Sequence, residues 1–305
     1  MSFEVLALVG PTASGKSDLA ISLARELSRE GVSLEIVNGD AMQLYAEMNI
    51  GTAKLSVEQR SAVPHHLFDI LSPSDEMTAV EFQRLAREKF AEISSRGAVP
   101  LLVGGSMFYI AAALDGLEFA PTDAQVRSSL EQEAEALGPG LLFNRLRELD
   151  PETAKVIPQQ NVRRVIRALE VIAITGEPYS NSLPSPTFNL PTLALGIEVE
   201  RDLLKQRIQT RVLQMWDSGL LAEAQGLRER YILSRTASVA IGYSQAFRQL
   251  DGILTQEQAI EGTVQLTNRY ARRQMSWFRR DARIQWLKSS EQLLESALER
   301  IRLAQ

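Results

Sequence analysis

Apolar residues occur along the chain in two alternating patterns, short continuous runs and longer segments with helical spacing. The continuous runs are residues 3–9, 34–37, 99–103, 193–197 and 284–287. Runs of this length are typical of strands that are buried on both faces of a parallel sheet. The segments with helical spacing are residues 19–27, 79–94, 201–231 and 256–278. Strands that alternate with helices predict an α/β fold with a parallel sheet flanked by helices.

One long stretch interrupts this alternation, because residues 121–186 show helical spacing without a strand. Its predicted helices are residues 124–137, 140–149 and 160–175, and a Pro- and Ser-rich connector follows at 182–191. A strand pattern returns at residue 193, so the stretch is an insertion and not a tail. We therefore expect a core formed by residues 1–120 and 187–305, with an all-helical insertion domain at 121–186.

Composition narrows the possible chemistry. The 305 residues include no Cys and two His, which excludes a disulfide scaffold, a cysteine nucleophile and a thiolate zinc site, and disfavours a His-based metal cluster. No run reaches the ~18 apolar residues that cross a bilayer, and the N-terminal segment lacks a basic region before its apolar run. We expect a cytoplasmic, monomeric protein without a membrane partner, whose chemistry comes from Asp, Ser, Lys, Arg and the backbone.

The charge is unevenly distributed. The formal net charge is −5, which alone argues against a nucleic-acid partner. However, 27 of the 33 basic residues are Arg, whose planar group suits phosphate recognition. Residues 115–150 hold eight acids and three Arg, whereas residues 269–283 hold six Arg and one Asp. The net charge therefore does not exclude a local surface that binds nucleic acid.

The first strand leads into a glycine-rich turn. Its sequence is Gly10-Pro11-Thr12-Ala13-Ser14-Gly15-Lys16-Ser17, which fits the P-loop pattern. Glycines let backbone N–H groups curl around a diphosphate, Lys16 adds a positive charge, and Ser17 can bind Mg²⁺. The position between a predicted strand and a predicted helix supports a phosphate-binding turn over a merely structural one.

Two further strands end in polar groups that we expect to lie near this turn. The second strand delivers Asp40, and the third ends in Gly104-Gly105-Ser106 instead of the Asp that helps an ordinary NTPase to hold Mg²⁺. Ligands of parallel sheets bind at the carboxyl ends of the strands. Asp40 is therefore a candidate general base, although an Asp at this place can also cap the next helix.

These segments, together with others along nearly the whole chain, resemble the bacterial tRNA dimethylallyltransferases, also called tRNA isopentenyltransferases. Besides the P-loop, the shared strings are Asp40-Ala41-Met42-Gln43-Leu44-Tyr45, Ile50-Gly51-Thr52-Ala53-Lys54, Pro64-His65-His66-Leu67, Val103-Gly104-Gly105-Ser106, Arg164-Val165-Ile166-Arg167-Ala168-Leu169-Glu170, Ile241-Gly242-Tyr243 and Arg269-Tyr270-Ala271-Arg272-Arg273-Gln274-Met275 followed by Trp277-Phe278. Several of these strings are weak singly, but their order and spacing are specific.

The resemblance implies transfer of a dimethylallyl group from dimethylallyl diphosphate to N6 of the adenosine just 3′ of the anticodon. It implies that Lys16 and Mg²⁺, with Ser17 as a metal ligand, offset the charge of the leaving diphosphate. Asp40 matches the family's general base, and Ser106 matches a hydroxyl residue beside the acceptor adenine. The adenine must leave the anticodon-loop stack to reach these groups.

The resemblance also implies a tRNA-binding surface. Asp40, Ala41, Met42 and Gln43 match the segment that reads the target adenine and its neighbour, and the insertion matches an arm on the anticodon stem-loop. The remaining expected tRNA contacts are Arg127, Arg163, Arg164, Arg167, Arg272 and Arg273. We expect Trp277 and Phe278 to supply anchoring bulk beside the basic stretch.

The chain departs from the family pattern at three places. Val239 stands where an Arg usually helps to bind the diphosphate, Ala46 stands where an Arg is common, and Asn49 replaces an Asp. A Val239→Arg change is therefore expected to lower the Michaelis constant for dimethylallyl diphosphate.

Three other functions remain open on the sequence: a small-molecule P-loop kinase, an adenylate isopentenyltransferase, and an RNA-binding protein with a relic P-loop. The adjacent His65 and His66 could suggest a metal pair. However, neighbouring residues of an extended backbone point in opposite directions, so a structural or RNA-loop role is favoured.

Overall fold

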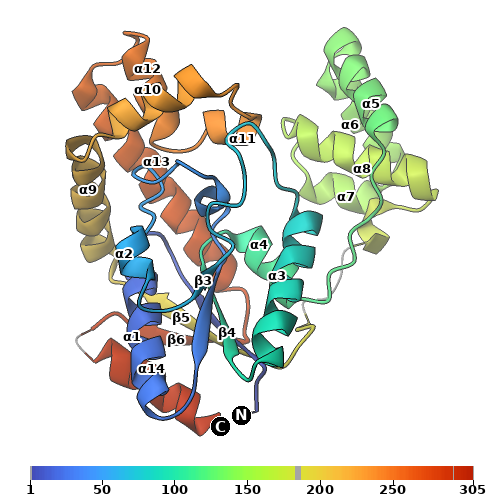
Figure 1. The fold of residues 1–305 in the computed structure, drawn as a ribbon. Helices are drawn as coiled ribbons and strands as arrows, with labels where there is room; N and C mark the ends of the chain where they lie inside the picture. The colour runs from blue at the N-terminus through green and yellow to red at the C-terminus, as the bar shows by residue number, and fades with distance from the viewer. Residues whose placement is uncertain (1, 183–186, 291, 305) are drawn as a thin grey trace. The chain divides into compact units, whose positions relative to one another are not determined.

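The computed structural model describes residues 2–182, 187–290 and 292–304, and its described part contains a six-stranded sheet (Figure 1). In spatial order the strands are β3 (His65–His66), β2 (Leu34–Asn38), β4 (Val99–Gly104), β1 (Val5–Val9), β5 (Thr192–Glu198) and β6 (Ile284–Lys288). Every neighbouring pair is parallel. The predicted parallel α/β sheet is confirmed.

Both faces of the sheet are buried, because successive side chains of each strand enter different cores. Val5, Ala7 and Val9 of β1 belong to one apolar cluster, whereas Leu6 and Leu8 belong to the other. Two helices cover the face of Leu6 and Leu8, namely α1 (Lys16–Arg29) and α14 (Leu293–Leu303). The opposite core contains apolar residues of α3 (Ala79–Ser95), α4 (Met107–Leu114), α9 (Arg201–Asp217), α10 (Leu220–Arg230), α12 (Tyr243–Leu250) and α13 (Gln256–Phe278).

The helical segment 201–231 consists of two helices, because the chain turns at Gly219 between α9 and α10. Gly219 has a φ of 96°, in the left-handed region that glycine adopts without steric cost. Three short elements elsewhere in the first unit have no clear pattern in the sequence. They are η1 (Ala41–Leu44), α2 (Val57–Arg60) and α11 (Arg235–Ser238).

The chain divides into two compact units, Met1–Asp115 with Phe188–Gln305, and Gly116–Thr187. The second unit contains α5 (Ala124–Leu137), α6 (Pro139–Leu149), α7 (Pro151–Val156), α8 (Val162–Thr175) and η2 (Tyr179–Ser182). Its own core includes Leu130, Leu142, Leu146, Val165 and Leu169. Of the connector expected at 182–191, residues 183–186 lie outside the described residues.

In the first unit, the chain leaves for the insertion after Asp115 and returns at Phe188, and contacts hold these two residues together. Asp115 and Phe188 form an antiparallel bridge, and Arg283 holds both residues. The guanidinium of Arg283 lies 2.6 Å from the Asp115 carboxylate and 3.9 Å from the centre of the Phe188 ring. This Arg of the basic stretch therefore has a structural task within the first unit.

None of the helices in the described residues is long and apolar enough to span a membrane.

Candidate active site

The P-loop turn joins β1 to α1, and its backbone adopts conformations that depend on small residues. Gly15, the residue before α1, has a φ of 89°, and Ala13 has a φ of 61°. A Cβ atom at Gly10 would lie 3.1 Å from the carbonyl oxygen of Ile197, so a larger residue would push the turn away from β5. The glycines therefore give the turn its tight shape at the N-terminus of α1, where an anion is favoured.

Lys16 lies in a desolvated place within this turn. Its ammonium donates hydrogen bonds to the carbonyl oxygen of Pro11 at 2.6 Å and to the hydroxyl of Ser14 at 3.4 Å. Burial lowers the pKa of Lys16 to about 8; the negative charge of Asp40 opposes this shift, and the positive charge of Arg211 adds to it. A bound anion would restore the charged form.

A cavity of 690 Å³ opens at the carboxyl ends of the strands and contains the P-loop. Its lining includes Thr12, Ala13, Ser14, Gly15, Lys16, Ser17, Asp18, Asp40, Gln43, Thr52, Ala53, Leu55, Arg207, Arg211 and Gln274. The P-loop and the carboxylate at the end of β2 thus face one space. A cation and a carboxylate in one cavity can act together, the cation on an anionic leaving group and the carboxylate on a proton of the attacking group.

Hydrogen bonds fix both the backbone and the carboxylate of Asp40. The amide of Asn38 accepts a hydrogen bond from the backbone N–H of Asp40 at 2.8 Å and donates one to its carbonyl oxygen at 3.0 Å. One carboxylate oxygen of Asp40 accepts from the N–H of Met42 at 2.9 Å and so caps η1. Ser106 accepts from the N–H of Ala41 at 2.8 Å. The structure therefore links Asp40 and Ser106 through the turn that contains Ala41 and Met42.

Gln274 of α13 forms hydrogen bonds to both the P-loop and the loop after β4. Its amide oxygen accepts from the N–H of Thr12 at 2.9 Å, and its amide nitrogen donates to the carbonyl oxygen of Gly105 at 2.8 Å. The residue is 1% exposed. Tyr270, one turn earlier, lies 3.5 Å from the same carbonyl oxygen; burial and the charge of Asp40 raise its pKa to about 12. The sequence pattern contained both residues but did not indicate their task.

Arg211 of α9 is a site residue that sequence reasoning missed. Its guanidinium donates to the hydroxyl of Thr12 at 3.1 Å and lines the cavity of Lys16. Burial lowers its pKa, although a guanidinium remains charged. In contrast, Val239 is 65% exposed and does not line this cavity. The expected benefit of Val239→Arg thereby loses its geometric basis, since α9 supplies the cation near the P-loop.

The Arg residues of the insertion fall into two groups. Arg163 and Arg164 are exposed on α8, as an RNA contact requires. Arg127 and Arg167 instead bind the buried carboxylate of Glu170, at 2.8 Å and 2.9 Å. Glu170 is 0% exposed, so both of these Arg residues stabilise the fold of the second unit. Arg167 also donates to the carbonyl oxygens of residues 120 and 121, which leaves little of its guanidinium free for phosphate.

The basic residues of α13 remain exposed. Arg272 and Arg273 are both exposed, and the guanidinium of Arg273 lies 5.7 Å from the centre of the Tyr270 ring. Trp277 is 42% exposed, whereas Phe278 is 2% exposed and belongs to the core. The expectation that Phe278 anchors a partner is therefore wrong, because its ring is used in packing.

The two His residues do not form a metal pair. The Nε2 atom of His66 lies 2.6 Å from the Glu35 carboxylate, and the Nδ1 atom of His65 lies 2.6 Å from the carbonyl oxygen of Val63. The described residues contain no group of three or more His, Cys, Asp or Glu that could hold a metal ion. Both His residues therefore have structural partners at the edge of the sheet.

A family model described as IPP transferase matches residues 43–281. The chain belongs to the IPP transferase family. It is 47% identical over 299 residues to a tRNA dimethylallyltransferase of Bifidobacterium longum, covering 98% of this chain and 90% of the relative. It is 49% identical over 289 residues to a tRNA dimethylallyltransferase of Kineococcus radiotolerans, covering 93% and 90%.

Solved structures place the chain in the same IPP transferase family. The full-length tRNA isopentenylpyrophosphate transferase of Bacillus halodurans is 36% identical, with a TM-score of 0.70 and coverage of 99% of this chain and 97% of that one. A eukaryotic dimethylallyltransferase described as acting on tRNA is 25% identical, with a TM-score of 0.81 and coverage of 97% and 77%. These similarities extend over nearly the full length of the chain and confirm the predicted family.

Proposed function

We propose that this protein transfers a dimethylallyl group from dimethylallyl diphosphate to N6 of the adenosine immediately 3′ of the anticodon in tRNA, with release of diphosphate. The observation that supports this most is the single cavity lined by Lys16, Asp40 and Arg211. Two relatives named tRNA dimethylallyltransferase, each covered to 90% of its length, support the same reaction.

The P-loop side of the cavity is suited to the leaving group. Diphosphate leaves with a growing negative charge when the C1–O bond of the donor breaks. Lys16, Arg211 and the N-terminus of α1 all place positive charge at this side. Their low exposure to water strengthens the attraction, because charges interact more strongly in a medium of lower polarity.

The opposite wall is suited to the acceptor. The N6 amino group of adenine is a poor nucleophile, since its lone pair is delocalised into the ring. As N6 bonds to C1 of the donor, the carboxylate of Asp40 takes one N6 proton and later returns it to water. The N–H of Met42 orients this carboxylate, Asn38 holds the backbone of Asp40, and Ser106 fixes the adjoining turn.

The residues present fit Mg²⁺ as a cofactor. Ser17 and Asp18 line the cavity at the start of α1, where a metal would meet the diphosphate. Mg²⁺ commonly binds one or two protein oxygens and completes its shell with water and substrate phosphates. Ser17 would hold the ion, which when bound neutralises charge on the diphosphate.

The tRNA surface is assigned to exposed Arg residues and to the turn after β2. Arg163 and Arg164 of the insertion and Arg272 and Arg273 of α13 lack carboxylate partners among the described residues. Such guanidinium groups bind RNA phosphates and stack on bases. Asp40, Ala41, Met42 and Gln43 would meet the target adenine and its neighbour. We propose a cytoplasmic monomer, since one chain supplies all these groups and tRNA is the proposed substrate.

Two other functions are tested alongside this one. The protein is incubated with Mg²⁺, labelled dimethylallyl diphosphate and either AMP or an anticodon stem-loop with consecutive adenines, and a parallel set contains labelled ATP in place of the donor. We expect label on the stem-loop alone. Label on AMP alone would indicate an adenylate isopentenyltransferase, and phosphate transfer from ATP would indicate a kinase; either result contradicts the proposal.

The role of Asp40 is tested with Asp40→Asn. Asn caps helices as well as Asp does, so the N–H of Met42 keeps its acceptor while the base is lost. Transfer should fall by roughly a hundredfold or more, the usual contribution of a general base, with stem-loop affinity nearly unchanged. Activity equal to the unmodified enzyme would remove Asp40 from the mechanism.

The matched control is Asp217→Asn at the end of α9. Asp69→Asn is unsuitable as a control, because Asp69 pairs with Lys54 and Arg60.

A further inference from the structure

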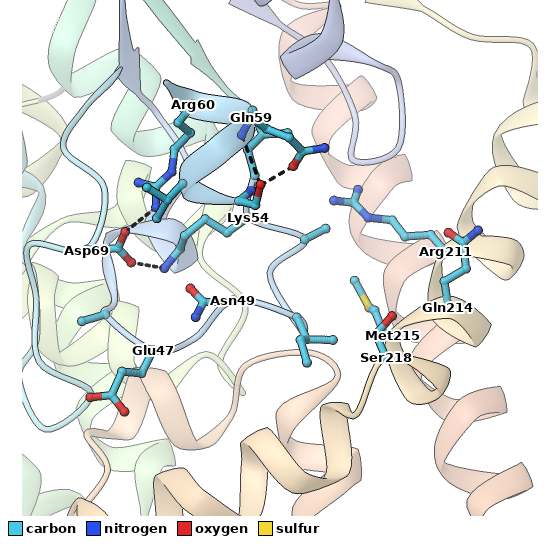
Figure 2. A pocket seen from close by; sticks show the side chains of 16 residues that line it. Glu47, Asn49, Lys54, Gln59, Arg60, Asp69, Arg211, Gln214, Met215 and Ser218 are labelled. Carbon is cyan, nitrogen blue, oxygen red and sulfur yellow. Dashed lines mark hydrogen bonds and ion pairs between the residues drawn. The ribbon is translucent and has the colours of Figure 1, made fainter. Parts of the chain in front are cut away.

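The segment 49–55 contributes to the lining of two cavities. Thr52, Ala53 and Leu55 line the cavity of Lys16. A second cavity, of 660 Å³, is lined by Asn49, Ile50, Ala53, Lys54, Leu55, Arg60, Asp69 and Met215, among others (Figure 2). Hydrogen bonds to its backbone hold the segment beside these cavities.

The backbone is also strained within this segment and just before it. Glu47 has a φ of 63° and Ala53 a φ of 48°, in the left-handed region that residues with a Cβ atom seldom adopt. Such conformations persist where surrounding contacts hold them, and they cluster at functional sites. The contacts that hold this segment therefore indicate what it does.

One clamp is the carboxylate of Glu223 on α10. It accepts hydrogen bonds from the backbone N–H groups of Asn49 at 3.2 Å, Ile50 at 3.0 Å and Gly51 at 3.4 Å. The hydroxyl of Tyr243 donates to Glu223 at 2.5 Å and accepts from the N–H of Gly51 at 3.2 Å. Tyr243 is fully buried, and a Cβ atom at Gly51 would lie only 2.4 Å from its ring. Three successive N–H groups thus converge on one carboxylate.

A second clamp holds the end of the segment. The ammonium of Lys54 lies 2.6 Å from the Asp69 carboxylate and donates to the carbonyl oxygen of Tyr45 at 2.6 Å. Arg60 binds the other oxygen of Asp69 at 2.9 Å, and Figure 2 shows both cations pointing at this carboxylate. Residues 49–54 are therefore fixed at each end.

Between the clamps, the segment contacts one residue of the proposed tRNA-reading turn. The carbonyl oxygen of Thr52 accepts a hydrogen bond from the amide nitrogen of Gln43 at 3.1 Å. This contact sets the orientation of the amide, because the carbonyl oxygen accepts only from the nitrogen end. The amide oxygen of Gln43 is then the end left to accept from a base, and an exocyclic amino group is the complementary donor.

We infer that Glu223 is a positioning residue that, through residues 49–52, fixes the Gln43 amide so that the site selects an amino-bearing base beside the target adenine. This inference rests on the proposed function. Tyr243 acts with Glu223, because burial and the neighbouring carboxylate raise the pKa of its hydroxyl and keep it a donor. Neither residue touches the reacting atoms.

The test compares Glu223→Gln with Glu229→Gln, which makes the same change at an exposed site on the same helix. A Gln at 223 brings a donor against the three N–H groups and should release the segment. Two stem-loops are used, with adenine or with unsubstituted purine, which lacks the exocyclic amino group, as the 3′ neighbour of the target adenine. Their affinities are measured by fluorescence anisotropy, and KM and kcat are measured by transfer of labelled dimethylallyl groups.

Glu223→Gln should raise the Kd and KM of the adenine stem-loop about tenfold, as expected for loss of one charged hydrogen bond, and leave kcat within about twofold. The preference for adenine over purine should collapse to that of Gln43→Ala. The double variant Glu223→Gln/Gln43→Ala should be no worse than Gln43→Ala alone. Glu229→Gln should match the unmodified protein, and the Kd of dimethylallyl diphosphate should be unchanged in every variant.

An equal loss on both stem-loops, or losses that add in the double variant, would show that Glu223 only stabilises the fold and would overturn the inference. If Glu223→Gln lowers the melting temperature severely, Tyr243→Phe carries the test, because it removes the hydroxyl and keeps the ring. Absence of transfer by the unmodified enzyme contradicts the proposed function alone, since anisotropy still reports the base preference.

Discussion

The lowered pKa of Lys16 makes donor binding depend on pH in a range where a lysine ordinarily stays charged. Burial is the main cause of the shift from 10.5 to about 8. The diphosphate binds the ammonium form, so affinity in the free enzyme should be full below pH 8 and fall as the pH rises above it. Above about pH 8 the alkyl diphosphate itself is fully ionised and adds no further pH dependence.

The expected loss follows from the fraction of Lys16 that is charged. With a pKa of about 8, that fraction falls from nearly one at pH 7 to roughly one in thirty at pH 9.5, which corresponds to ~2 kcal/mol of binding free energy. The effect on folding has the opposite sign. Between about pH 8 and 10.5 the unfolded chain binds the proton that the folded chain has released, so the contribution of Lys16 to stability rises with pH.

The assay is calorimetric titration of dimethylallyl diphosphate into the protein from pH 7 to pH 9.5 at constant ionic strength. Lys16→Arg is the control, because its guanidinium stays charged and any remaining affinity should change little with pH. Constant affinity of the unmodified protein across the range would refute the reasoning, since it would mean that Lys16 keeps its proton in the empty cavity.

Three further outcomes are expected. Arg211→Ala should raise the KM for dimethylallyl diphosphate at least tenfold in steady-state assays, whereas Val239→Arg should leave it unchanged; the reverse order would contradict the placement of the cavity cation. Gln274→Ala leaves one buried and one partly buried backbone group without a partner and should lower the free energy of unfolding by ~1–3 kcal/mol in urea titrations, and no loss would mean that water replaces the amide. Glu170→Ala leaves two partly exposed Arg residues without their carboxylate and should destabilise the insertion by ~1–3 kcal/mol, while Arg163→Ala should weaken stem-loop binding without a change in thermal stability. Equal effects on stability would contradict the division between these groups.

The sheet could be predicted from sequence because a strand buried on both faces leaves a local pattern. The run at residues 99–103 becomes β4 (Val99–Gly104), and the run at 193–197 becomes β5 (Thr192–Glu198). In contrast, β3 (His65–His66) has two residues and only half-buried side chains, and its extended form depends on pairing with β2. No local pattern of hydrophobicity marks such an edge strand.

The candidate site was predictable where local motifs carry it, as at the P-loop and Asp40. Arg211 left no such signal, because its task depends on the packing of α9 beside a loop almost two hundred residues earlier in the chain. Glu223 is similar, since its three donors lie on a segment that is about 170 residues distant. Contacts of this kind follow from tertiary structure, and helical spacing in the sequence showed only that α9 and α10 pack against the core.

The net charge of −5 fails as a guide to the RNA partner because Arg residues perform three different tasks in this fold. Arg127 and Arg167 neutralise a buried carboxylate, and Arg283 fixes the point where the chain leaves and returns. A guanidinium already bound to carboxylates has few donors left for phosphate. Under the proposed function, the surface available to RNA is set by exposed Arg residues that have no acidic partner in the described part of the chain, such as Arg163 and Arg272, and the total charge does not count these. Replacing such residues should weaken stem-loop binding and reduce its salt dependence, whereas replacing the paired ones should first reduce stability.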